Sequence, residues 1–208
     1  MATPTTMGLA VTTLPQALSA RKWVTASLAA TTAGFGLALG FVMVQGVFAP
    51  LSDLAMVASA GSLLPVAWYL HRVQRVEDPS ASGVAVTVGT AGLSLMVVAG
   101  LGLAFKDVTG IQTQLPFLDA QHLGLVLQGG WMALAGLTGL RQVVFRRVTS
   151  AACLVAGIGY AVGAVVNLRL GFEHPLFYVS FLVALAGFVT WALALRTDLK
   201  PTTERSGR

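Results

Sequence analysis

Long apolar runs, separated by short polar stretches, make up most of this chain. Each run is free or nearly free of charged residues over about 20 positions, the length of α-helix that crosses roughly 30 Å of hydrocarbon. A bilayer offers no water to the backbone, so such a run satisfies its own polar groups as a helix. The pattern predicts an all-α transmembrane helical bundle of six spans: Trp23 to Val47, Leu51 to Leu70, Gly83 to Phe105, Phe117 to Leu140, Val148 to Leu168 and Pro175 to Leu195.

The composition excludes an ordinary water-soluble domain. Of the 208 residues, 55% are apolar and 10% are charged, whereas soluble domains carry roughly 25% charged residues. The mean hydropathy of +0.77 also favours hydrocarbon over water. We therefore expect a loose or interfacial tail over residues 1–20, a transmembrane domain over 21–198 and a polar tail over 199–208, with the lipid bilayer as the main partner.

Basic residues predict the orientation, because Lys and Arg concentrate in cytoplasmic loops. Lys106 and Arg169 fall on one side of the six spans. The other eleven fall on the opposite side, namely Arg21, Lys22, Arg72, Arg75, Arg141, Arg146, Arg147, Arg196, Lys200, Arg205 and Arg208. Both termini are predicted to be cytoplasmic (N-in/C-in). These residues sit beside the spans, where they set topology and meet anionic headgroups, so the net charge of +5 indicates no nucleic-acid partner.

Prolines and acids recur at the turns of the predicted outer side. Pro50-Leu-Ser-Asp53 begins the second span, Pro116-Phe-Leu-Asp119 begins the fourth, and Glu173-His174-Pro175 precedes the sixth. The recurrence suggests three helical hairpins of similar build. Helix capping is the simpler interpretation, since proline suits the first helical turn and a carboxylate there meets the positive end of the helix dipole.

The second half of the chain carries a resemblance to known sequences. The stretch from Asp119-Ala-Gln-His122 through Arg146-Arg147 to Gly157-Ile-Gly-Tyr160 resembles small bacterial polytopic membrane proteins that form domains of unknown function. The resemblance implies a helical membrane fold and no particular activity. Together with the Ala- and Gly-rich composition, it implies a multi-pass protein of a bacterial inner membrane.

Ionisable residues of the predicted outer half are the candidates for a ligand-binding site, because such groups are costly at membrane depth and usually mark function. They are Asp53, Asp119, His122, Arg169, Glu173 and His174. Carboxylates and imidazoles can bind a metal ion such as zinc, and two histidines can hold a haem between helices. Arg169 can bind an anion or pair with Glu173. No paired-ligand motif occurs, so the sequence assigns no metal and no cofactor.

Other residues within the spans favour packing roles. Gln45 and Gln128 can line a cavity or hydrogen-bond between helices, and the second role is the more common one. Small residues at four-residue spacing, as in Gly159 and Gly163, predict close helix packing within the bundle, with a dimer face as the alternative. Three tryptophans lie near span ends, as interfacial anchors do, namely Trp23, Trp68 and Trp191.

The leading hypothesis from the sequence is a non-enzymatic membrane protein that binds or passes a small solute or ion at an outward-facing polar vestibule. It would act alone, as a homo-oligomer or as a subunit of a membrane complex. The alternative is an intramembrane metal-dependent enzyme or a haem-binding redox subunit that uses the outer Asp and His residues. A third hypothesis is a purely structural assembly partner.

Overall fold

The computed structural model describes residues 14–43, 49–111, 116–142, 144–171 and 173–199. Within these ranges the regular elements are six α-helices and no strand, which confirms the predicted all-α helical bundle. The helices are α2 (Leu14–Met43), α3 (Ala49–Gln74), α4 (Pro79–Thr109), α5 (Phe117–Gln142), α6 (Arg147–Leu170) and α7 (Pro175–Asp198).

Five of these helices, α3 to α7, are long and apolar enough to cross a membrane, with mean hydropathies between 1.3 and 2.1 over their most apolar windows. The chain is therefore an integral membrane protein. Helix α2 is 30 residues long and lies against α3. It begins at Leu14, upstream of the predicted Trp23, so residues 14–20 of the expected tail are helical. The predicted end of this span, residues 44–48, lies outside the described residues.

Local sequence explains where several helices begin and end. The Asp78 carboxylate accepts a 2.9 Å hydrogen bond from the backbone N–H of Ala81, and Pro79 occupies the first turn of α4, where no donor is required. At the other end of α4, Gly110 has φ +69° and its N–H bonds to the Lys106 carbonyl. These residues place the α4 boundaries close to where the hydrophobic run predicted them.

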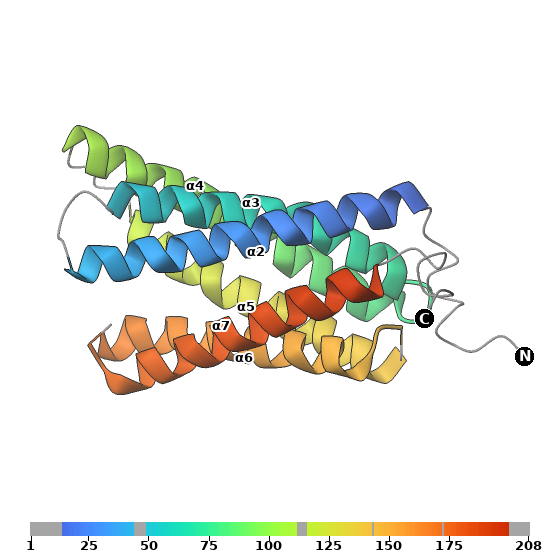
Figure 1. Cartoon of the computed structure of the whole chain (residues 1–208). Coiled ribbons are helices and arrows are strands. Elements are labelled where there is room, and N and C mark those ends of the chain that lie inside the picture. Colours follow the sequence, from blue (N-terminus) through green and yellow to red (C-terminus); the bar gives the residue numbers. More distant parts are fainter. Residues whose placement is uncertain (1–13, 44–48, 112–115, 143, 172, 200–208) are drawn as a thin grey trace, which may run out of the picture.

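Each helix packs against its sequence neighbour, so the bundle follows the order α2, α3, α4, α5, α6, α7. In Figure 1 α2, α3 and α4 lie on one side, α6 and α7 on the other, and α5 passes between them. We call the end at which α2, α4 and α6 begin the basal end, and the end at which α3, α5 and α7 begin the distal end. Among the described residues, α2 and α7 close the ring with far fewer contacts than any pair of sequence neighbours makes.

Glycines bring neighbouring backbones into direct contact. A Cβ on Gly129 of α5 would lie 2.6 Å from the Gly157 carbonyl oxygen of α6. A Cβ on Gly159 would lie 2.7 Å from the Ala184 nitrogen of α7, while one on Gly163 would be in ordinary contact with Ser180. Gly159 and Gly163 therefore pack inside the bundle, as the four-residue spacing predicts.

An aromatic cluster fills the core of the bundle. The rings of Trp131 and Trp191 meet edge to face with centroids 6.4 Å apart, and Phe188 lies 5.6 Å from Trp191. Trp191 is 1% exposed, so the prediction that it is an interfacial anchor is wrong. Its large ring gains more from filling the gap between α5 and α7 than from reaching the membrane surface. Trp23 and Trp68 are exposed, as anchors would be.

Candidate functional site

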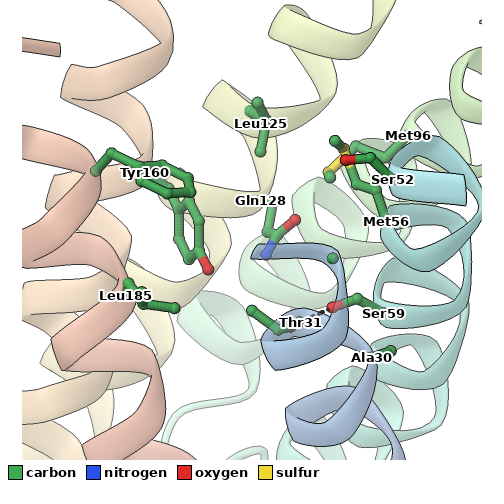
Figure 2. A pocket seen from close by; sticks show the side chains of 12 residues that line it. Ala30, Thr31, Ser52, Met56, Ser59, Met96, Leu125, Gln128, Tyr160 and Leu185 are labelled. Atoms are coloured by element: carbon green, nitrogen blue, oxygen red, sulfur yellow. Dashed lines mark hydrogen bonds between the residues drawn. The ribbon is translucent and has the colours of Figure 1, made fainter. Parts of the chain in front are cut away.

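A cavity of about 140 Å³ lies among all six helices (Figure 2). Each helix contributes at least one side chain, so the cavity is a product of the whole bundle. None of the described residues that line it carries a charge. They are Ala30, Thr31 and Gly34 of α2, Ser52, Met56 and Ser59 of α3, Met96 of α4, Leu125 and Gln128 of α5, Tyr160 of α6, and Phe181 and Leu185 of α7.

Hydroxyl groups form the polar wall of the cavity where α2 meets α3. The hydroxyl groups of Thr31 and Ser59 are hydrogen-bonded at 2.6 Å. Ser27, one helical turn before Thr31, donates to the Ser59 carbonyl at 3.3 Å and has its hydroxyl 3.3 Å from that of Ser59. Such bonds join transmembrane helices without any charged residue. The wall is therefore polar but electrically neutral.

Gln128 is a buried polar residue of the cavity whose hydrogen bonding is incomplete. It lies on α5 and is 4% exposed, and its Oε1 atom has no hydrogen-bond partner in the described structure. Figure 2 shows its amide group between Tyr160 on one side and Ser52 and Met56 on the other. A buried polar atom without a partner costs about 1–3 kcal/mol. The structure shows Gln128 in the cavity-lining role that the sequence analysis considered less common.

Apart from the hydroxyl groups of Ser52 and Tyr160, the rest of the lining is apolar and adaptable. Met56 and Met96 contribute flexible thioethers, and Leu125, Phe181 and Leu185 contribute hydrocarbon surface. A cavity of roughly 150 Å³ is large enough for benzene, and one water molecule needs only about 10–15 Å³. The site can therefore hold a molecule the size of one small ring or a short alkyl chain.

Asp53 is the predicted site residue nearest to this cavity along the chain, since its neighbour Ser52 lines the wall. Its carboxylate interacts with the side chain of Gln121 on α5 and lies near Asp107 of α4. Gln121 also donates a hydrogen bond to the Met56 sulfur at 3.2 Å. This group contains one of the six predicted site residues, Asp53, and its other members, Gln121 and Asp107, were not among them.

His122 is buried and both of its ring nitrogens are in use. It is 7% exposed, its Nδ1 lies 2.7 Å from the Leu118 carbonyl oxygen, and its Nε2 lies 2.6 Å from Nδ2 of Asn167 on α6. The carbonyl can only accept, so Nδ1 carries the proton and Nε2 accepts from the Asn167 amide. Binding of a metal ion or haem iron by Nε2 would require the Asn167 bond to break.

The other predicted residues lie at the distal end, at the start of α5, at the end of α6 and just before α7. Asp119, Arg169 and Glu173 are exposed, and His174 caps α7 by accepting the Leu176 N–H at 3.3 Å. Among the described residues, Arg169 and Glu173 form no ion pair within 4.0 Å. Over the ranges that the structure describes, no three His, Cys, Asp or Glu side chains lie close enough together to hold a metal ion. Whether these residues bind a ligand stays a prediction.

A polar network at the basal end links α6 to α7 and was not expected from the sequence. The buried carboxylate of Asp198 accepts hydrogen bonds from Arg146 Nε at 2.5 Å and from Thr149 Oγ1 at 2.7 Å. Arg146, which the sequence analysis counted only as a topology signal, therefore also anchors the end of α7. The pairing joins residues far apart in sequence, so no local motif announces it.

Comparison with known proteins adds no relative: no family model, no curated protein and no solved structure matches the chain. The resemblance to small bacterial membrane proteins stays a prediction, and the functional argument depends on the cavity alone.

Proposed function

We propose that this integral membrane protein binds a small, uncharged molecule that carries a hydroxyl or similar hydrogen-bonding group, in the cavity between its six helices. The observation that supports this most directly is the buried amide of Gln128, whose Oε1 is without a hydrogen-bond partner in a cavity large enough for a ligand. A bound molecule that bonds to this amide would remove the cost of the unpaired group.

The absence of charge from the lining favours a neutral ligand over an ion. An ion transferred into a low-dielectric site without a counter-charge meets a large desolvation cost. The described lining offers hydroxyls, one amide and two thioethers instead. The part of the sequence-based hypothesis that concerns a small solute is therefore retained, and the part that concerns an ion is not.

A hydroxyl group matches Gln128 in either orientation of the amide. Rotation of the amide by half a turn exchanges its acceptor oxygen for its donor nitrogen, and a hydroxyl group can serve as partner to both. Phenol and short alkanols combine this group with an apolar body of suitable size for Met56, Met96 and Leu185. Benzene has the same body as phenol without the hydroxyl, which makes the two a matched pair of probes.

Thermal unfolding of the purified protein in detergent, with phenol or benzene added, tests the proposal. A ligand that binds only the folded state raises the free energy of unfolding by RT ln(1 + [L]/Kd). We expect phenol to stabilise the native protein more than benzene does, by the worth of one hydrogen bond, about 0.5–1.5 kcal/mol. In Gln128→Leu this preference should vanish.

The Gln128→Leu variant also corrects for the different partition of the two probes into detergent. Each probe enters the micelles to the same extent whether the native protein or the variant is present. Gln142→Leu is the matched control, since Gln142 is also a partly satisfied amide but lies outside the cavity lining. Equal preference for phenol in the native protein and in Gln128→Leu would refute the proposal.

We further propose that the basal end faces the cytoplasm of a bacterial cell. The helix ends that meet there carry Arg21, Lys22, Arg72, Arg141, Arg147 and Arg196, whereas Lys106 and Arg169 lie toward the distal end. This asymmetry supports the assignment through the bias of basic residues toward the inner side of the membrane.

A further inference from the structure

The seam between α2 and α7 is a loosely packed joint of the bundle. The five helix pairs that follow one another in sequence pack extensively, whereas α2 and α7, like α3 and α5, make few contacts in the described structure. In Figure 1 the two helices diverge toward the distal end. Toward the basal end, Ala20 and Val24 of α2, Leu195 of α7 and Leu199 just after α7 all belong to the buried core. The seam is therefore closed basally and loosens distally.

The cavity lies against this seam. Its lining includes Ala30 and Gly34 on the α2 side and Phe181 and Leu185 on the α7 side. These four residues are partly exposed rather than buried. On the α2 side Ala30 is a small residue, and Gly34 packs against Ala55 of α3. The cavity is therefore lined by α2 on one side of the seam and by α7 on the other.

The surroundings of the seam match the interior of a bilayer. From Trp23 to Met43, α2 contains no charged residue, and α7 contains none from Pro175 to Leu195. Beside the seam, Leu182 and Val183 of α7 are exposed. A surface of this kind is stable in contact with acyl chains rather than with water. An opening at this seam would lead into lipid.

We infer that the ligand of the cavity is a lipid-soluble molecule with an alkyl or aryl body and one hydroxyl-type group, and that it reaches Gln128 sideways from the bilayer between α2 and α7. This inference rests on the proposed function, because it assumes that the cavity binds a ligand. It adds the source of that ligand and the route by which it arrives. The competing route runs along the bundle axis from the water at the distal end.

A probe that cannot leave the bilayer distinguishes the two routes. The full-length protein is placed in phosphatidylcholine vesicles that contain a phosphatidylcholine with a hydroxyl and a diazirine at the end of one acyl chain. After illumination, mass spectrometry of peptides locates the adducts. We expect adducts on residues of the cavity wall such as Met56, Met96 and Tyr160, because the tethered chain end can pass between the two helices.

Variants at the edge of the seam provide the second part of this labelling experiment. Ala30→Trp should lower cavity labelling by the tethered probe by about tenfold, since the indole overfills the passage. Ala29→Trp is the matched control, because Ala29 is exposed on the same helix and does not line the cavity, and its labelling should equal that of the native protein. Leu185→Trp blocks the opposite edge and replaces Ala30→Trp if that variant does not fold.

A free diazirine-bearing hexanol partitions between water and lipid. It distinguishes failure of the lateral route from failure of the cavity to bind a ligand at all. Cavity labelling by the free probe without labelling by the tethered probe would overturn lateral access and leave the proposed function intact. Tethered labelling that persists in both Ala30→Trp and Leu185→Trp would also overturn the route between α2 and α7. Failure of both probes to label the cavity would overturn the proposed function together with the inference.

Discussion

Two buried glutamines illustrate how, at the scale of single residues, the same side chain can serve packing or binding. Gln74 donates a 2.9 Å hydrogen bond to the Ala135 carbonyl and so joins α3 to α5, whereas the Oε1 of Gln128 has no partner. Both side chains are almost fully buried. The difference predicts opposite effects of the same substitution.

Gln74→Leu should lower the free energy of unfolding, because it deletes a bond between helices, and such bonds contribute about 0.6 and at most about 1.7 kcal/mol in membrane proteins. Gln128→Leu should leave the free energy of unfolding unchanged or raise it by about 1 kcal/mol, since it replaces an unpaired polar group with an apolar one. Unfolding titrations with SDS in mixed micelles measure both values. A larger loss in Gln128→Leu than in Gln74→Leu would show that Gln128 is structural.

The basal network makes a second prediction for single residues. Arg146→Gln deprives the buried Asp198 carboxylate of its cation and should cost about 1–3 kcal/mol of unfolding free energy. The neighbouring Arg147 is exposed and has no ion pair in the described structure, so Arg147→Gln is the control and should cost less than about 0.5 kcal/mol. Equal losses in the two variants, measured in the same titration, would contradict the role assigned to Arg146.

Sequence alone was informative about which residues are polar within the spans and uninformative about their partners. Gln128 is recognisable in the sequence as an amide within an apolar run. Whether it hydrogen-bonds between helices or lines a cavity depends on the rotation of α5 about its own axis relative to α3 and α6. Thr31 and Ser59 are ordinary residues for a membrane helix, and only their 2.6 Å contact reveals the polar wall. His122 was expected to face a ligand, yet Asn167, distant in sequence, already occupies its Nε2.

At the scale of helices, the lengths of the apolar runs predicted five spans closely, because hydrocarbon thickness sets helix length. The boundaries of α4 and α7 follow from local signals, Asp78 with Pro79 and His174 with Pro175. The start of α2 was missed, since residues 14–20 have no apolar run of span length to mark a helix. Helix pairing was not predictable beyond adjacency, because small-residue spacings occur on most of the helices.

Glycine contacts make a prediction at this scale. Gly129→Ala places a methyl group 2.6 Å from backbone atoms of α6 and should destabilise the protein by about 1–3 kcal/mol, because backbones cannot move apart without separating the helices. Gly83→Ala on α4 meets nothing within 4 Å and should be neutral or stabilising by about 0.5–1 kcal/mol through helix propensity. Thermal unfolding of both variants checks the contrast, and a stable Gly129→Ala would refute backbone contact between α5 and α6.

At the scale of the whole molecule, the distribution of charge predicts the orientation in the membrane. A reporter fused after residue 208 should be active only as a cytoplasmic reporter, such as a fluorescent protein, and inactive as a periplasmic phosphatase. A reporter inserted at Gly110, in the connection between α4 and α5, should show the reverse. Phosphatase activity at the C-terminus would invert the proposed topology, while the bundle and its cavity would stand.

The bundle as a whole explains why a cavity exists at all. Five tightly packed helix pairs surround a centre that the small residues of α2 do not fill, and α2 and α7 make few contacts beside it. Sequence patterns predicted the membrane bundle but not this hollow, because its volume depends on the packing of all six helices together. The ionisable residues that attracted the sequence-based hypothesis lie mostly beyond it, at the distal end.

The most direct test of the central claim is anomalous diffraction from crystals of the protein soaked with 4-bromophenol. We expect a bromine peak inside the cavity, with the phenol hydroxyl within hydrogen-bonding distance of the Gln128 amide, and a weaker peak in Gln128→Leu at a concentration near the native Kd. Bromine peaks confined to the lipid-facing surface, or side chains that fill the space among Met56, Gln128 and Tyr160, would contradict it.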